Sequence, residues 1–199
     1  FAGTVANVSS LNYNGSAITN LTVSALTKSG VSTSSSSGNS RASGWGTGST
    51  NGAVSAGGSV DLAKYFEFTI TAGSGYTISN PTLTFGVGRS ATGPRRFQWR
   101  SNLDSYGSAI SVGTVNSSIS HSSGVLETPD GTSGYTGNII TVTTSGQTSI
   151  TFRFYAYGAE ATSGTGGLEG NLSFGGTLVA SSSTPTLTTP TVSAITDVS

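Results

Sequence analysis

Four arginines gather in one short stretch of this chain and are its strongest chemical signal. Arg89, Arg95, Arg96 and Arg100 are four of only eight Lys and Arg residues among 199. The planar guanidinium group binds carboxylates, sulfates and phosphates through two parallel hydrogen bonds, and it stacks on flat rings. We therefore expect this stretch to contact an anionic or polyhydroxylated ligand.

A second segment places similar chemistry on alternate residues. In the run 150–157, Arg153, Tyr155 and Tyr157 alternate with apolar residues. Successive side chains of a β-strand point to opposite faces, so these three share one face when the apolar set enters the core. The same rule applied to 96–100 buries its two aromatic residues and exposes its polar ones. If the two strands lie in one sheet, the predicted binding face consists of Arg96, Gln98, Arg100, Arg153, Tyr155 and Tyr157.

Such a face suits sugars, because Tyr rings stack on the apolar side of a pyranose while Arg and Gln bind hydroxyls, sulfates or carboxylates. The alternative is a solvated face whose arginines pair with the few acidic residues. Trp45 either packs beneath a sheet edge or presents its ring to the ligand, whereas strand alternation places Trp99 in the core. The further candidate ligand-binding residues are Arg95, Arg89, Trp45 and Arg41.

The acidic residues and the single histidine form no pattern typical of catalysis. Glycoside hydrolysis requires two carboxylates at a defined separation, and no such pair is visible in the sequence. His121 lies in a Ser-rich segment without a nucleophile-elbow motif, so we read it as a solvated loop residue and expect a non-catalytic protein. The absence of Cys removes disulfides and the usual structural zinc sites. A structural calcium ion is the one cofactor considered, with candidate ligands Asp61, Asp104 and Asp130.

Alternation of apolar and polar residues recurs along the chain, and no helical period is evident. Strands without intervening helices predict an all-β fold, namely an antiparallel β-sandwich of the jelly-roll type. The expected strands cover 21–26, 65–70, 83–87, 96–100, 110–115, 139–142, 150–157 and 168–179. The expected turns are 73–75 and 129–131, and the expected loops are 28–51, 116–137 and 160–167.

We expect a single module over residues 1–179, followed at 180–199 by a Thr/Pro-rich linker and the start of another module. The chain contains no Met, which suggests a mature protein or a piece of a longer one. It shows no signal peptide and no apolar run of membrane-spanning length. A net charge of zero disfavours nucleic acid as a partner. The Ser-, Thr- and Gly-rich, charge-poor composition is typical of bacterial secreted or cell-surface modules.

Residues 59–178 resemble the carbohydrate-binding-module-like β-sandwiches of large secreted or surface proteins from polysaccharide-degrading bacteria. The resembling stretches are 61–70, 92–106 and 151–159. The resemblance implies a jelly-roll domain, a polysaccharide as partner, and catalytic or immunoglobulin-like neighbouring modules in the same parent chain. It assigns no binding residue.

The arginines and the resemblance together predict a module that anchors a secreted enzyme to a polysaccharide and so raises the local concentration of its catalytic part. The arginine cluster favours a sulfated or otherwise anionic algal-type glycan. The alternative is a structural or adhesive spacer of a bacterial surface protein. An open groove with unpaired guanidinium groups would favour the ligand-binding hypothesis, whereas a face covered by residues 28–52 would favour the spacer.

Overall fold

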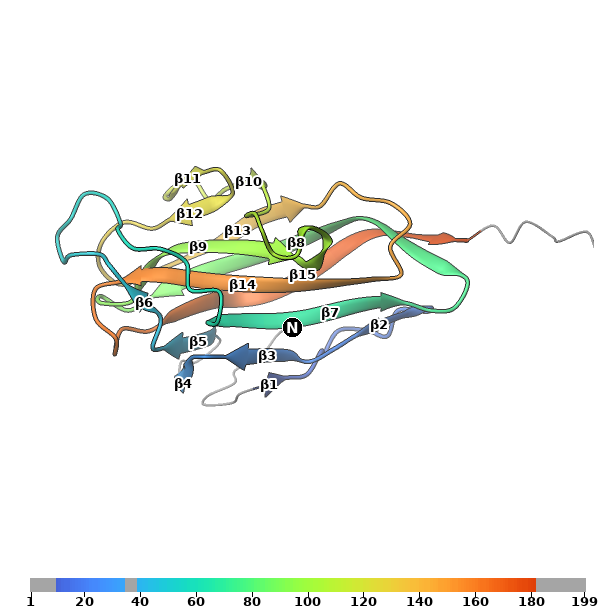
Figure 1. The fold of residues 1–199 in the computed structure, drawn as a ribbon, viewed down its shortest axis with the longest axis horizontal. Helices are drawn as coiled ribbons and strands as arrows, with labels where there is room; N and C mark the ends of the chain where they lie inside the picture. The colour runs from blue at the N-terminus through green and yellow to red at the C-terminus, as the bar shows by residue number, and fades with distance from the viewer. Residues whose placement is uncertain (1–9, 35–38, 182–199) are drawn as a thin grey trace, which may run out of the picture.

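The computed structural model describes residues 10–34 and 39–181, and these form two β-sheets packed face to face (Figure 1). The first sheet has the order β1-β3-β7-β14-β9-β12-β11, with β2 paired to β7 and β6 to β14. The second has the order β10-β13-β8-β15-β5-β4. Among the described strands, every pairing is antiparallel except that of β6 with β14. The predicted all-β, antiparallel β-sandwich is confirmed, and its jelly-roll connectivity stays a prediction.

The strands of the first sheet are β1 (Ser10–Leu11), β2 (Leu21–Val23), β3 (Leu26–Ser29), β6 (Gly46–Thr47), β7 (Tyr65–Ala72), β9 (Pro94–Ser101), β11 (Ser120–Ser122), β12 (Val125–Glu127) and β14 (Ser149–Ala159). Those of the second are β4 (Ser32–Ser34), β5 (Asn39–Ser43), β8 (Tyr76–Arg89), β10 (Val112–Thr114), β13 (Ser133–Thr141) and β15 (Gly166–Ala180). A 3₁₀ turn, η1 (Asn102–Asp104), follows β9.

The core lies between the two sheets and is built by the alternation visible in the sequence. Phe68 of β7, Phe152 of β14 and Phe85 of β8 are all buried there. Trp99 of β9 packs edge-on against Phe85 with ring centroids 5.8 Å apart, which joins the two sheets and confirms its predicted core position. Burial of each large apolar side chain contributes roughly 1.5–3 kcal/mol to stability. The residues that alternate with these core positions, among them Glu67 of β7, Arg96 of β9 and Arg153 of β14, therefore lie on the outer face of the first sheet.

Two segments predicted to be loops contain strands. Within 28–51 the chain forms β4, β5 and β6, and within 116–137 it forms β11 and β12. These strands are two to five residues long, and all but β12 consist mostly of small polar residues and Gly, so their sequences show little alternation. Pairing with longer neighbours determines their conformation instead.

The predicted linker and following module at 180–199 fall outside the described residues beyond Ser181, as do residues 1–9 and 35–38. Within residues 10–34 and 39–181, no helix has the length and apolar character needed to cross a membrane.

Candidate functional site

The two segments predicted to form the binding face are neighbouring strands. In the pairing of β14 with β9, Arg153 lies opposite Arg100, Tyr155 opposite Gln98, and Tyr157 opposite Arg96. Their side chains point away from the core, because the alternate residues of both strands belong to it. The predicted adjacency of these six side chains is confirmed. We call this set the Arg–Tyr face.

The middle of the Arg–Tyr face is not open to solvent. Gln98, Tyr155 and Tyr157 expose only 4%, 0% and 7% of their surface, so the expectation that they face water is wrong. The Tyr155 ring lies 6.0 Å from the ring of Tyr65, and the Arg100 guanidinium carbon lies 5.6 Å from the Tyr155 ring centroid. Neighbouring side chains on the same face therefore cover the ring that the sequence suggested as a sugar platform.

Burial also affects the phenol groups. It raises the pKa of Tyr155 and of Tyr157 above the ordinary value, and the nearby Arg100 charge partly opposes both shifts. The Tyr155 hydroxyl is buried beside Arg153 without a hydrogen bond of good geometry. With its amide oxygen turned toward Arg100, Gln98 accepts hydrogen bonds of 3.0 Å from Nε and Nη2 of that residue. The centre of the face is thus a packed layer of side chains.

One end of the Arg–Tyr face is closed by contacts around Arg153. Its Nε donates to Glu67 Oε2 on β7 at 2.5 Å, and its guanidinium carbon lies 4.1 Å from the ring centroid of Tyr65 and 3.9 Å from that of Tyr106. Tyr106 follows η1 in the left-handed region, with φ 61°. Arg100 Nη1 holds this turn by donating to the carbonyls of Tyr106 and Gly107 at 2.7 and 3.0 Å.

The other end is open and contains a hollow of about 410 Å³. A row of side chains crosses four strands here, because Tyr157 lies opposite Arg96, Arg96 opposite Glu127, and Glu127 opposite Ser120. We call this site the Arg96 hollow; its lining is Arg96, Ser120, His121, Ser122, Val125, Glu127 and Tyr157.

Arg96 retains donors toward this hollow. Its Nε donates to Glu127 Oε2 at 3.1 Å, and both side chains are partly exposed. Among the hydrogen bonds of the described residues, none uses Nη1 or Nη2 of Arg96. Each terminal nitrogen has two N–H groups, so the residue can offer four further hydrogen bonds to a ligand.

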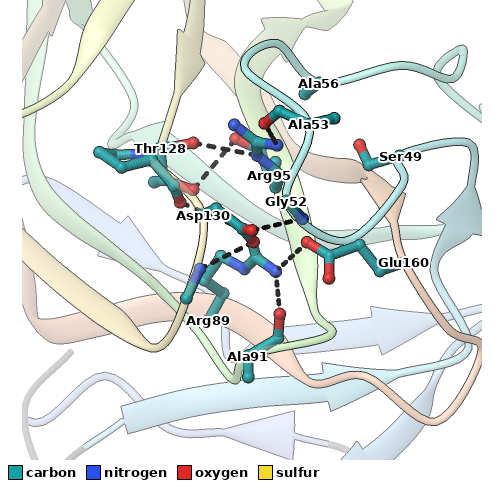
Figure 2. Close-up of polar contacts among 12 residues, drawn as sticks. Ser49, Gly52, Ala53, Ala56, Arg89, Ala91, Arg95, Thr128, Asp130 and Glu160 are labelled. Atoms are coloured by element: carbon teal, nitrogen blue, oxygen red, sulfur yellow. Dashed lines mark hydrogen bonds and ion pairs between the residues drawn. The ribbon is translucent and has the colours of Figure 1, made fainter.

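Arg89 and Arg95 lie in the interior, so the structure corrects their prediction as ligand-binding residues. They expose 0% and 1% of their surface. Figure 2 shows their guanidinium groups among the loops at one end of the sandwich. Arg89 pairs with Glu160 at 2.6 Å and donates to the carbonyls of Ser90, Ala91 and Pro129. The guanidinium groups of Arg89 and Arg95 both donate to backbone carbonyls and so hold loops together.

Arg95 fixes a different pair of segments. Its Nη1 donates to the carbonyl of Ala53 at 2.6 Å, its Nη2 to that of Val54 at 3.4 Å, and its Nε to that of Thr128 at 3.3 Å. The residues between β6 and β7 are thereby tied to the end of β12 (Figure 2).

Neither Trp45 nor Arg41 belongs to the Arg–Tyr face. Trp45 is buried, with its Nε1 donating to the carbonyls of Ala42 and Gly166, which confirms the packed alternative. Arg41 belongs to the second sheet and pairs with Glu169 at 2.5 Å. A Cβ at Gly88 would meet both of these charged groups, so the ion pair lies directly over glycine backbone.

The three candidate calcium ligands do not converge. Asp61, Asp104 and Asp130 accept hydrogen bonds from backbone N–H groups of their own turns, and Asp130 also accepts one from Gly52 at 2.6 Å. In the part of the chain that the structure describes, no three His, Cys, Asp or Glu side chains come together as a metal site would require. The three carboxylates therefore do not form one shared site, and Arg89 is the cation beside Asp130, at 3.7 Å.

Several residues of the site were not predicted. Glu67 and Tyr65 share the polar face of β7, but the sequence does not reveal that β7 lies beside β14. His121 was read as a loop residue, whereas it lies exposed on β11 and lines the Arg96 hollow. Glu127 was not singled out, because the short strand β12 has no clear alternation.

Comparisons of the chain with protein-family models, with curated proteins and with solved structures found no match.

Proposed function

We propose that the protein is a non-catalytic carbohydrate-binding module that holds a polysaccharide at the Arg96 hollow. The observation that carries the proposal is the pair of unused terminal nitrogens of Arg96 in an open, polar hollow. Exposed hydroxyls of Ser120 and Ser122 supply further donors and acceptors there, and His121 also belongs to the lining. Binding sites of this kind combine a concave shape with a few convergent polar groups.

The charge balance of the hollow favours a neutral, polyhydroxylated glycan over an anionic one. Glu127 lies 3.1 Å from Arg96, so its negative charge offsets the guanidinium charge next to the ligand. A sulfate or uronate would be attracted by one group and repelled by the other, whereas sugar hydroxyls can donate to the carboxylate and accept from Nη1 and Nη2. This reverses the sequence-based preference for an anionic polymer, which assumed unpaired arginines.

The module would act by keeping a secreted or cell-surface bacterial parent protein on its polysaccharide, beside catalytic or immunoglobulin-like neighbouring modules. A shallow site immobilises little of the ligand surface, so we expect a dissociation constant on the order of 10⁻⁶ to 10⁻⁴ M for one site. Attachment through a parent chain raises the effective concentration of the catalytic module without requiring tighter binding.

Affinity gel electrophoresis tests the proposal with a panel of neutral polymers (xylan, mannan, mixed-linkage β-glucan, agarose) and anionic ones (alginate, carrageenan). We expect retardation in at least one neutral gel. Loss of a hydrogen bond from a charged donor costs about 1.5–3 kcal/mol, so Arg96→Ala should weaken binding about ten- to hundredfold. Arg96→Lys keeps the charge but not the planar donors and should weaken it less. The matched control is Lys64→Ala, which removes a cation paired with Asp61 away from the hollow.

A second candidate function, a structural spacer, is supported by a different observation. Each arginine of the Arg–Tyr face has a partner within the chain: Glu127 for Arg96, Glu67 for Arg153, and the turn at 106–107 for Arg100. Such pairing is what a rigid, non-binding face would require. A spacer predicts no retardation by any polymer and an Arg96→Ala variant whose only change is a small loss of stability.

A further inference from the structure

A second hollow adjoins the Arg96 hollow on the other side of Glu127. Its volume is about 370 Å³, and its lining includes Ser117, Ser118 and Ile119 together with Val54. The two hollows share Ser120 and Glu127 in their linings, so they meet at these two residues. We call the second site the Ser118 hollow.

The boundary between the hollows carries no unbalanced charge. Glu127 Oε1 accepts a hydrogen bond from the Ala56 backbone N–H at 2.6 Å, and Oε2 accepts one from Arg96 Nε at 3.1 Å. Its carboxylate is therefore held on two sides and compensated by the guanidinium. A neutral sugar chain can cross this boundary without leaving a buried charge unpaired. The free-energy cost is small when polar groups exchange hydrogen bonds with water for hydrogen bonds with sugar hydroxyls.

The far wall of the Ser118 hollow is fixed before any ligand arrives. Besides Ala56, the loop that carries Val54 is tied at two more points: Gly52 N–H donates to Asp130, and Arg95 donates to the Ala53 carbonyl, both at 2.6 Å. Figure 2 shows the loop held by Arg95 of β9 and by Asp130 of the turn after β12. A preorganised wall reduces the entropy cost of binding.

Apart from Glu127 and the buried Arg95, the lining of the Ser118 hollow is uncharged and amphipathic. Ser117 and Ser118 are exposed hydroxyls, whereas Val54 is 100% exposed and offers only methyl groups. Arg95 also belongs to the lining, but it is 1% exposed and directs Nε, Nη1 and Nη2 to backbone carbonyls, so its guanidinium presents little surface to the hollow. Hydroxyl edges beside small apolar surfaces match a pyranose ring, which has hydroxyls at its edge and C–H groups on its faces.

We infer that the two hollows form one groove for an extended, neutral oligosaccharide segment, with at least one sugar unit on each side of Glu127. The inference rests on the proposed function and deepens it, because it makes the ligand the interior of a chain. Each hollow by itself lies near the lower end of the range of about 300–1,000 Å³ for small-molecule sites. A single sugar would use one hollow and leave the other to water.

Calorimetric titration with neutral oligosaccharides of one, two, four and six units tests the inference. The probes are the β-1,4-glucose, β-1,4-xylose, β-1,4-mannose and β-1,3-glucose series. In at least one series, we expect the affinity to rise about tenfold or more between two and six units. Ser118→Phe fills the second hollow and should abolish that rise while leaving binding of a single unit intact. Ser122→Phe fills the Arg96 hollow and should weaken binding at both lengths.

One control variant and one substitute variant support this experiment. Ser145→Phe places the same ring at an exposed serine between β13 and β14 and should leave all affinities unchanged. If Ser118→Phe fails to fold, Ser117→Phe fills the same hollow from the neighbouring position. Equal affinity for two and six units, or an unchanged affinity of Ser118→Phe for six units, would overturn the groove and leave the proposed function standing. Failure of every oligosaccharide and every polymer to bind would overturn both.

Discussion

The guanidinium of Arg153 lies 3.9 Å from the ring centroid of Tyr106, a residue that reaches it from the turn after β9. Tyr65 contacts the same guanidinium at 4.1 Å, and Glu67 pairs with its Nε. The positive charge is thus surrounded by two electron-rich ring faces and one carboxylate. Through this contact with Arg153, Tyr106 joins the turn at 102–107 to β14.

Removal of this ring should destabilise the protein measurably. A cation–π contact contributes about 0.5–1 kcal/mol when exposed and about 2 kcal/mol when desolvated, and Arg153 is partly exposed. We expect Tyr106→Ala to lower the free energy of unfolding by about 1 kcal/mol in urea titrations. Tyr106→Phe keeps the ring and should remain within about 0.5 kcal/mol of the parent. Equal losses in both variants would assign the effect to the hydroxyl and contradict the cation–π interpretation.

Arg89 should be far more important for stability than for binding. Its side chain is fully buried against Glu160, which is 3% exposed, so Arg89→Met leaves a buried carboxylate without its cation. Breaking a buried pair by removing one partner costs about 3–5 kcal/mol. The variant should show that loss in urea unfolding, and Arg89→Met/Glu160→Leu should recover part of it. Additive losses in the double variant would show that the two groups do not stabilise each other.

The division of β9 and β14 into two faces could be predicted because both strands are long and alternate cleanly, whereas their pairing was only a condition of the hypothesis. A period of two places Arg153 and Tyr155 on one face regardless of what surrounds them. Neighbouring strands then need only to share a sheet for the face to form, as the pairing of Arg153 with Arg100 shows.

The exposure of these residues could not be predicted in the same way. Tyr155 is buried beneath Tyr65 and Arg100, and Arg153 lies against Tyr106, so two of the three covering groups come from a third strand and a turn. Arg95 is buried because carbonyls of two distant loops converge on it. Local sequence patterns contain no information about which loops meet at the end of a sandwich, so alternation identifies a face and not its accessibility.

Stability should increase with pH near pH 8–10, because burial lowers the pKa of Lys28 to about 8 from its ordinary value of 10.5. Between these two values the unfolded chain still holds the proton that the folded chain has released. The unfolded state therefore binds more protons, and the free energy of unfolding rises with pH across this window. Lys28 Nζ lies 2.8 Å from the Arg41 carbonyl oxygen and 5.1 Å from the Phe66 ring centroid. These contacts hold the amino group in the partly buried position where its pKa is lowered.

Thermal unfolding of the parent and of Lys28→Met at a series of pH values checks this prediction. The difference in midpoint between the two proteins should change between about pH 7.5 and 9.5, in the direction that favours the parent as pH rises. The upper limit is needed because Tyr106, Tyr155 and Tyr157 have raised pKa values, so their ionisation opposes folding at higher pH. A constant difference across the window would mean that Lys28 keeps its ordinary pKa in the folded protein.

Glu127 should control the loop that borders both hollows, because its Oε1 accepts a hydrogen bond from the Ala56 N–H at 2.6 Å. Hydrogen exchange at the Ala56 amide reports this contact directly. A hydrogen bond to a charged group contributes about 1.5–3 kcal/mol, so Glu127→Ala should speed exchange at Ala56 about ten- to hundredfold. Glu127→Gln keeps a neutral acceptor oxygen and should have a smaller effect.

A second carboxylate with the same local role provides the control. Asp104 Oδ2 accepts from the Ser108 N–H at 2.9 Å, on the turn that carries Tyr106. Asp104→Ala should speed exchange at Ser108 and leave Ala56 unchanged, whereas Glu127→Ala should do the reverse. If Ala56 exchanges at the parent rate in Glu127→Ala, the loop is held by Arg95 and Asp130 alone. In that case Glu127 is free to orient Arg96 without any coupling to the wall of the Ser118 hollow.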